Sequence, residues 1–400
     1  MPAKRSLILA LALLLVAAIP VRATGFPAMN VIDTIRPGVG SSYALWGNGR
    51  LGDFLYFGAD DATHGSELWR TNGTTTELVQ DIRSGADGSS PYGFTALGDA
   101  LYFAANDDTN GSELWRTNGT TTTLVEDINT GSSGADGSWP YGFTALGDAL
   151  YFVANDATHG YELWRTNGTT TTLVQDINTG SSGADSSSPD GFTAFGGYLY
   201  FRAYDATHGY ELWRTNGTTT TLVEDINTAN SGADSSSPDD LTAYGAYLYF
   251  QADDGTHGSE LWRTNGTTTE LVQDIYIDDS SYPRYFTALG DALYFAANDG
   301  ENGKLWRTSA AGTIESASPA GTNVFFGCMC ERPILTLDGR LFATVTTGET
   351  GYEFAYLDEP TFGLPGTNRD GSVWSTALVL LAAVTAVAGV GLRMRGAPRS

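Results

Sequence analysis

Apolar and polar residues alternate in short runs along most of the chain, and the runs return in the same order. In one complete copy they cover Gly142–Leu146, Leu150–Ala154, Tyr161–Thr166 and Thr171–Ile177. Alternation with a period of two, rich in aromatic and β-branched residues, predicts four half-buried β-strands. The Asn167-Gly168 pair between the last two runs predicts a tight hairpin, because both residues tolerate a positive φ.

The unit repeats with a period typical of propeller blades. The tryptophan of a Leu-Trp pair recurs at spacings of 46, 49, 49, 49 and 44 residues, at Trp69, Trp115, Trp164, Trp213, Trp262 and Trp306. A seventh copy stops after three runs, Pro333–Leu337, Leu341–Val345 and Tyr352–Leu357, and the early run Val31–Ile35 resembles the missing fourth. The pattern predicts an all-β, seven-bladed β-propeller of four-stranded antiparallel blades over residues 29–359, closed by the N-terminal strand. An open β-solenoid is the alternative.

Both ends of the chain have the composition of targeting segments. Residues 1–23 combine two basic residues, an apolar run and a small-residue cleavage site, which predicts a secretory signal peptide. Residues 373–392 carry no formal charge and predict a transmembrane helix, followed by a basic cytoplasmic tail at 393–400. The linker 360–372 contains Leu-Pro-Gly-Thr-Asn, which resembles the sortase signal LPxTG and implies cleavage between Thr367 and Asn368. We therefore expect an exported protein at the cell surface, anchored by this helix or to the cell wall.

The charge of the body limits its partners. The whole chain carries −25, but seven of its 21 basic residues and only one of its 46 acidic residues lie outside 29–359. The body therefore carries −31. A polyanion repels the phosphate backbone, so a nucleic-acid partner is excluded.

The repeated block Glu67-Leu68-Trp69-Arg70-Thr71-Asn72-Gly73-Thr74 and its copies resemble the ELWxxDGT-repeat family of exported bacterial surface proteins. The resemblance implies a β-propeller-like repeat and no common catalytic activity. The family's Asp-Gly turn is Asn-Gly here, at Asn72, Asn118, Asn167, Asn216 and Asn265. Each Asn-Gly-Thr is also an N-glycosylation acceptor in a host with the machinery; the alternative is a plain hairpin turn.

Residues at equivalent positions of the copies can be compared, which tests whether a candidate catalytic residue type is required at its position. Four histidines stand before a glycine in a slot that asparagine fills in two other copies, at His64, His159, His208 and His257. This exchange favours a turn over acid–base chemistry. The repeated tryptophans are expected to fill the space between blades. The repeated Glu and Arg on either side of each Leu-Trp pair are expected to form ion pairs between blades.

Acidic loops provide the candidate ligand site. In an up-and-down blade, the second connector and the blade-to-blade connector emerge on one face, which predicts an acidic loop face with candidate ligand-binding residues Asp61, Asp108, Asp136, Asp156, Asp185, Asp205 and Asp254. Their carboxylates are suitable ligands for Ca²⁺, and no other cofactor is expected, although no complete D-x-D-x-D-G loop is present.

These features predict an exported, surface-anchored module for non-catalytic binding or adhesion, whose partner is an extracellular glycan or protein. The alternatives are a polysaccharide hydrolase or lyase with its site in the propeller channel, or a passive surface-coat protein. The enzyme would use acids that do not repeat, namely Asp278, Asp279, Glu315 and Glu331. Cys328 and Cys330 are either a local disulfide or free thiols.

Overall fold

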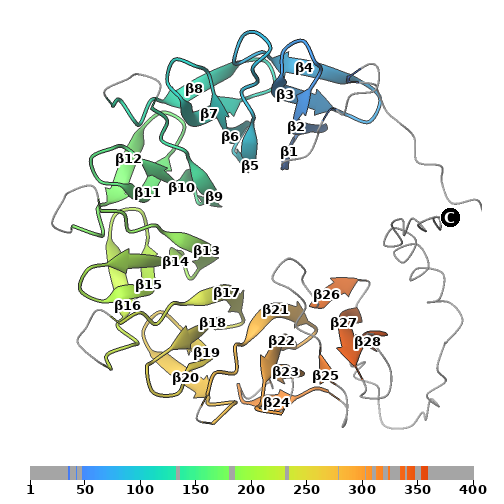
Figure 1. Cartoon of the computed structure of the whole chain (residues 1–400). Helices are drawn as coiled ribbons and strands as arrows, with labels where there is room; N and C mark the ends of the chain where they lie inside the picture. Colours follow the sequence, from blue (N-terminus) through green and yellow to red (C-terminus); the bar gives the residue numbers. More distant parts are fainter. Residues whose placement is uncertain are drawn as a thin grey trace, which may run out of the picture.

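In the computed structural model, the described part of the chain consists of β-strands and connecting loops. It comprises residues 35–36, 42, 47–131, 136–179, 185–229, 234–277, 279–301, 303–308, 312–318, 323–324, 334–337, 340–346 and 353–358. The strands form seven antiparallel sheets, called blades 1 to 7 in chain order. Figure 1 shows the blades following one another around a central axis, which is the arrangement of a β-propeller.

The first six blades each contain four strands that pair in sequence order. Blade 1 contains β1 (Asn48–Leu51), β2 (Phe54–Asp60), β3 (Ser66–Thr71) and β4 (Thr76–Gln80). Blade 2 contains β5 (Tyr92–Leu97), β6 (Ala100–Asn106), β7 (Ser112–Thr117) and β8 (Thr122–Glu126). Blade 3 contains β9 (Tyr141–Leu146), β10 (Ala149–Asn155), β11 (Tyr161–Thr166) and β12 (Thr171–Gln175).

The later blades continue the pattern until the last. Blade 4 contains β13 (Asp190–Phe195), β14 (Tyr198–Asp205), β15 (Gly209–Thr215) and β16 (Thr220–Glu224). Blade 5 contains β17 (Asp239–Tyr244), β18 (Tyr247–Asp253), β19 (Ser259–Thr264) and β20 (Thr269–Gln273). Blade 6 contains β21 (Arg284–Leu289), β22 (Ala292–Asn298), β23 (Gly303–Thr308) and β24 (Ile314–Ser316). Blade 7 contains β25 (Asn323–Val324), β26 (Ile334–Leu337), β27 (Arg340–Thr346) and β28 (Glu353–Asp358).

Blade 7 differs in topology. Both β25 and β26 pair with one edge of β27, and β28 pairs with the other edge. The three predicted runs correspond to β26, β27 and β28, whereas β25 is too short to give a sequence pattern. The predicted closing strand, Val31–Ile35, lies outside the described residues except for Ile35, so closure of the ring by the N-terminus stays a prediction.

The first strand of each regular blade is the innermost. Strands β1, β5, β9, β13, β17 and β21 contact one another in that order, and β21 contacts β26. The fourth strands lie on the outside of the ring (Figure 1). Every inner strand therefore begins at the same end of the central axis, which brings equivalent residues of successive blades together there.

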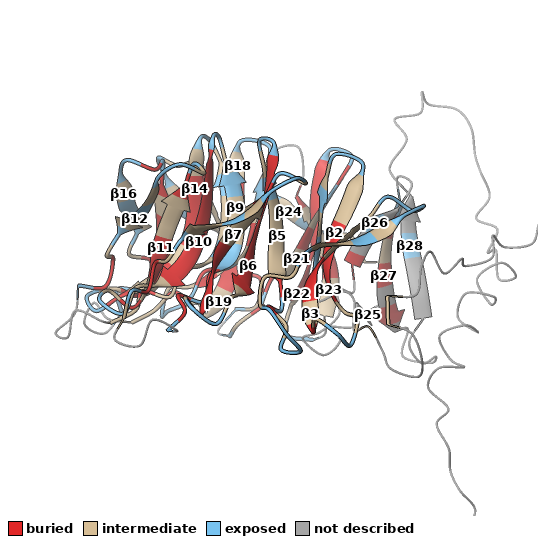
Figure 2. Cartoon of the chain, turned by 90° about the horizontal axis from the view of Figure 1, so that it is seen from above, coloured by how far each residue is buried: buried red, intermediate tan, exposed pale blue. Residues whose placement is uncertain are grey.

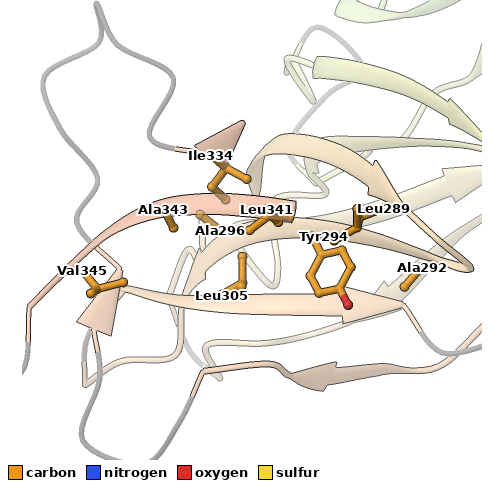
Figure 3. Close-up of a cluster of buried hydrophobic side chains, with 9 residues drawn as sticks. All are labelled: Leu289, Ala292, Tyr294, Ala296, Leu305, Ile334, Leu341, Ala343 and Val345. Atoms are coloured by element: carbon orange, nitrogen blue, oxygen red, sulfur yellow. The ribbon is translucent and has the colours of Figure 1, made fainter. Parts of the chain in front are cut away.

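The apolar core lies between neighbouring blades. Leu114 of blade 2 packs with Leu150 and Phe152 of blade 3, and similar clusters join the other neighbours. Figure 3 shows the cluster between blades 6 and 7, where Tyr294 and Leu305 meet Ile334 and Leu341. Because a neighbour covers each face, the middle strands are buried almost throughout (Figure 2).

Five of the six repeated tryptophans belong to these interblade clusters, as predicted. Trp213 is a buried member of the cluster between blades 3 and 4. Trp115, Trp164, Trp262 and Trp306 pack against the clusters between their own blades and the preceding ones. Their fixed place in the third strand is therefore explained by packing.

The targeting predictions lie outside the described residues. They concern residues 1–23, 360–372, 373–392 and 393–400, including the expected cleavage between Thr367 and Asn368. Cys328 and Cys330 also lie outside them. Within the described ranges, no helix is long and apolar enough to cross a bilayer.

Candidate functional site

The predicted acidic loop residues are mostly engaged by their own loops. The Oδ1 atom of Asp61 accepts hydrogen bonds from the backbone N–H groups of Thr63 and His64, each at 2.8 Å. Its Oδ2 atom lies 2.7 Å from Nδ1 of His64. The same Asp–His arrangement recurs in Asp156–His159, Asp205–His208 and Asp254–His257. These carboxylates hold the turn, and the histidines are turn residues, as the copies indicated.

Three of the Asp–His pairs, those of Asp61, Asp156 and Asp254, shift the pKa values of both partners. Burial opposes ionisation of Asp61, but hydrogen bonds from the backbone and ring of His64 outweigh it and lower the pKa of Asp61. The same balance lowers the pKa of Asp156 and Asp254. The hydrogen bond to Asp61 raises the pKa of His64. The aspartates are thus ionised hydrogen-bond acceptors within their loops.

The remaining predicted ligand residues do not complete a metal site. Asp108 has a positive φ of 69° and forms an ion pair at 2.5 Å with Arg83. This pair joins the second connector of blade 2 to the connector that precedes blade 2, and it confirms that both emerge on one face. Asp136 and Asp185 lie in the next two blade-to-blade connectors. Among the described residues, no three His, Cys, Asp or Glu side chains are grouped to hold a metal ion.

Of the four acids proposed for an enzyme, the two that the structure describes have separate local partners. Glu315 accepts a hydrogen bond at 2.7 Å from Nε of Arg307, on the neighbouring strand. Asp279 accepts one from the backbone N–H of Ser280. Asp278 and Glu331 lie outside the described residues.

The Asn-Gly pairs form the predicted hairpins. The Oδ1 atom of Asn72 accepts hydrogen bonds from the N–H groups of Thr74 and Thr75, at 3.0 and 2.9 Å. The same turn recurs at Asn118, Asn167, Asn216 and Asn265. Glycosylation at these exposed asparagines stays a prediction.

The expected Glu–Arg ion pairs between blades are wrong. Glu113 is fully buried and accepts hydrogen bonds from the N–H and hydroxyl of Ser138, and from the N–H of Ile128. Arg116 instead donates from Nη1 to the carbonyl of Gly168 in the next blade, at 2.5 Å. A buried glutamate next to several backbone N–H groups does not need a cation, and the half-buried guanidinium of Arg116 reaches the neighbouring hairpin.

This Glu–Ser contact recurs in the first five blades. The pairs are Glu67–Ser89, Glu113–Ser138, Glu162–Ser187, Glu211–Ser236 and Glu260–Ser281. Burial raises the pKa of Glu113, Glu162 and Glu211 to about 7, despite the hydrogen bonds that favour the ionised form. Because the set is identical in successive copies, it is a structural contact that ties each blade to the following connector.

The copies of blades 2 to 6 differ at the beginning of the inner strands. The first residue of these strands is Tyr92, Tyr141, Asp190, Asp239 or Arg284 in blades 2 to 6. The second residue is Gly93, Gly142, Gly191, Asp240 or Tyr285. All five second residues have a positive φ, including Asp240 at 56° and Tyr285 at 62°. Such departures from a repeat carry information about function, because packing of the blade does not require them.

An aromatic cluster lies at this end of blades 3 and 4. We define it as Tyr141, Tyr161, Tyr204 and Tyr210, together with the exposed Trp139 two residues before Tyr141. The rings of Tyr141 and Tyr161 are 6.1 Å apart, and those of Tyr204 and Tyr210 are 5.2 Å apart. The cluster stays accessible at its edge, since Trp139 is 54% exposed and Tyr141 is 39% exposed.

An ion pair lies within the aromatic cluster. Nε of Arg202 donates to Oδ1 of Asp190 at 2.8 Å, and Nη2 donates to the other carboxylate oxygen. The guanidinium also lies over the ring of Tyr210, 5.5 Å from its centroid. Burial, followed by the nearby charge of Asp190, raises the pKa of Tyr141 to about 12, so its hydroxyl stays protonated. The cluster thus combines apolar ring faces with fixed hydrogen-bonding groups.

An axial hollow of about 290 Å³ adjoins the cluster. It is lined by Gly191, Phe192, Thr193, Asp239, Asp240, Leu241, Thr242, Tyr285, Phe286, Thr287 and Ile334. Gly191 follows Asp190 of the ion pair directly, so the lining of the hollow begins one residue from the ion pair.

Neither the aromatic cluster nor the axial hollow was predicted from the sequence. The signal was present: Tyr161 and Tyr210 replace the serine or glycine of the other copies, and Arg202 stands where the first, second, third and sixth copies carry a small or apolar residue. The residues that differ between copies therefore mark this site, whereas the shared motif does not.

Comparison with known proteins assigns no family. No family model matches the chain, and no curated protein matches it. The resemblance to ELWxxDGT repeats therefore stays a prediction.

Solved structures of similar fold include a puromycin-hydrolysing peptidase from Mycobacterium tuberculosis, at 11% identity and a TM-score of 0.40, with 78% of this chain and 51% of that chain covered. A structure from a study of two prolyl endopeptidases matches at 10% identity and a TM-score of 0.42, with 78% and 50% covered. A xyloglucanase from Xanthomonas campestris matches at 15% identity and a TM-score of 0.34, with 69% and 46% covered. The chain spans about half the length of each.

These findings correct the prediction of an exported, surface-anchored module for non-catalytic binding or adhesion through the acidic loop face. The solved structures that the chain resembles are peptidases and a glycan-degrading enzyme, and none is named as an adhesion protein. The acidic loops, in turn, use their carboxylates to hold their own turns. The likeness itself shows the β-propeller fold alone.

Proposed function

We propose that the propeller recognises an oligosaccharide at the axial end of blades 3 and 4, with the aromatic cluster as its binding surface. The observation that carries this proposal is the 39% exposed Tyr141 beside Asp190 of the Asp190–Arg202 ion pair, two residues after the 54% exposed Trp139. A sugar ring has an apolar C–H face and a rim of hydroxyl groups. An aromatic ring packs against the C–H face, and a carboxylate–guanidinium pair forms hydrogen bonds with the hydroxyl groups.

The arrangement favours a sugar over a purely apolar ligand. Asp190 and Arg202 are half-buried beside the rings, and an apolar ligand would remove their water without replacing its hydrogen bonds. It also favours a sugar over a nucleic acid, because the body of the chain is strongly acidic. The proposed site is a small surface near the axis, distinct from the acidic loops, and the proposal concerns neither adhesion nor attachment to a cell.

The test is a panel of neutral oligosaccharides, followed by titration calorimetry with the sugars that bind. Trp139→Ser introduces the residue that the same connector slot carries at Ser90, Ser188 and Ser237, so the fold should tolerate it. We expect this variant to bind at least about tenfold more weakly, the loss of a central aromatic contact. Tyr282→Ser is the matched control, because Tyr282 is an exposed aromatic residue in the same slot three connectors further on.

Two results would overturn the proposal. One is the absence of binding by every oligosaccharide in the panel. The other is equal binding by the parent and Trp139→Ser, which would place the ligand elsewhere.

A further inference from the structure

The axial hollow exists because one residue departs from the repeat. In blade 3, a Cβ atom added to Gly142 would lie 2.7 Å from Cε2 of Phe192, so the phenylalanine of the next blade covers that glycine. In blade 4, a Cβ atom added to Gly191 would lie 3.8 Å from its nearest neighbour, Cδ1 of Leu241. Leucine stands where the neighbouring blades carry Phe192 and Phe286, and the smaller side chain leaves space above Gly191.

Two more residues that differ from the repeat line the same space. Asp240 and Tyr285 occupy slots that are glycine in blades 2 to 4, and both keep the left-handed backbone at a cost of about 1 kcal/mol or more each. They also contact each other, since the N–H of Tyr285 donates to a carboxylate oxygen of Asp240. Three successive exceptions to the repeat thus surround one hollow.

The polar lining of the hollow presents hydrogen-bond acceptors. The hydroxyls of Thr193, Thr242 and Thr287 donate to the carbonyls of Leu241, Asp240 and Tyr285, at 3.0 to 3.1 Å. Their remaining lone pairs can only accept. The exposed carboxylate of Asp239 is also an acceptor. Phe192 and Phe286 supply apolar surface. This lining suits a group that carries several O–H donors around an apolar face.

We propose that the axial hollow is a second subsite, which takes the next sugar unit of the oligosaccharide bound at the aromatic cluster. This inference rests on the proposed function. Its volume of about 290 Å³ lies at the lower end of small-molecule sites, which suits one ring rather than a whole ligand. Its position next to Asp190 allows one chain to lie across the ion pair and enter the hollow.

The experiment compares affinity as a function of ligand length. The probes are cello- and chito-oligosaccharides, from the disaccharide upward, titrated into the full chain. We expect affinity for the bound series to rise with length in the parent protein. Leu241→Phe restores the residue of the neighbouring blades and should fill the hollow. The variant should reduce the gain in affinity from the disaccharide to the longer sugars by at least about fivefold. It should leave the affinity for the disaccharide unchanged.

A second variant distinguishes the loss of a ligand contact from a change in the packing of the blades. Thr242→Val keeps the shape of the side chain and removes an acceptor, so it should also reduce the gain from the longer sugars. Phe94→Leu makes the opposite exchange at the equivalent position of blade 2, away from the hollow, and should leave the gain unchanged.

The outcomes separate the two proposals. If Leu241→Phe and Thr242→Val both show the parent's length dependence while Trp139→Ser binds weakly, the second subsite is wrong and the proposed function stands. If no sugar of any length binds, the proposed function is wrong, and the subsite is wrong with it.

Discussion

Glu113 accepts two hydrogen bonds from Ser138, one from its N–H at 2.7 Å and one from its hydroxyl at 2.5 Å. Both residues are fully buried and are separated by 25 residues of sequence. Ser138→Ala removes one donor from a buried carboxylate, so we expect the free energy of unfolding to fall by about 1–3 kcal/mol. Urea denaturation measures this loss. Thr123→Ala, at an exposed position of β8, is the control, and an equal effect in both variants would contradict the prediction.

The raised pKa values of the buried glutamates predict a pH dependence of stability. Glu113, Glu162 and Glu211 have an ordinary pKa of 4.5, and burial raises it to about 7 in the folded protein. Between these values the folded protein binds more protons than the unfolded chain. The free energy of unfolding should therefore decrease as pH rises through this window, by at most about 1.4 kcal/mol per pH unit for each group.

Denaturation at several pH values between about 5 and 8 tests this sign. Glu113→Gln cannot titrate at this position, so its stability should vary less steeply with pH. The lowered pKa values of Asp61, Asp156 and Asp254 act in the opposite direction, but at lower pH, below their ordinary value of 3.8. Stability that increased from pH 5 to 8 would refute the assignment.

The arginine of each repeat should stabilise the contact between neighbouring blades. Arg116 donates to the carbonyl of Gly168 across the boundary between blades 2 and 3. Arg116→Met keeps the apolar stem and removes the donor, so unfolding should become easier by about 1–3 kcal/mol. Arg50→Met is the control, because Arg50 is exposed and donates to Gly52 within its own hairpin. Thermal unfolding of the two variants should differ clearly; matching curves would show that the contact adds nothing.

Asp240 permits a direct measurement of backbone strain. Asp240→Gly and Asp240→Ala both remove the carboxylate that accepts the N–H of Tyr285. Only glycine adopts the φ of 56° without strain, so the glycine variant should be the more stable of the two by about 1 kcal/mol. An alanine variant as stable as the glycine variant would show that this backbone conformation is not strained.

Calcium removal should leave the described blades unchanged. The carboxylates of Asp61, Asp156, Asp205 and Asp254 already accept hydrogen bonds from their own loops. We expect the melting temperature to shift by less than about 1 °C between excess calcium and a chelator. A stabilisation that grows with calcium concentration would restore the metal-site hypothesis.

Much of the fold could be predicted because the same strand and turn motifs recur along the sequence. Leu-Tyr-Phe and Glu-Leu-Trp mark the second and third strands in successive copies, and Asn-Gly fixes the hairpin that follows. The structure places β9 to β12 within a few residues of the predicted runs. The short β25 was missed, because two residues carry no periodicity.

The contacts were harder to predict than the strands. Glu113 and Arg116 are close in sequence and opposite in charge, which suggested an ion pair. Their partners, Ser138 and Gly168, come from distant segments that only the assembled ring brings near. The aromatic cluster could not be predicted for a related reason: Tyr141 and Tyr210 lie in different blades, and neither belongs to the Leu-Tyr-Phe or Glu-Leu-Trp motif that the copies share.

The Glu–Ser contact also affects how such a chain can change in length. It joins each unit to the connector directly after it. A duplicated unit together with its connector would therefore carry both the glutamate and the serine of this contact. Blade 6 departs from this rule, because Lys304 stands in place of the glutamate and pairs with Asp299. Gene duplication or deletion among the first five units would preserve every such junction, and variation in copy number is therefore expected there among related genes.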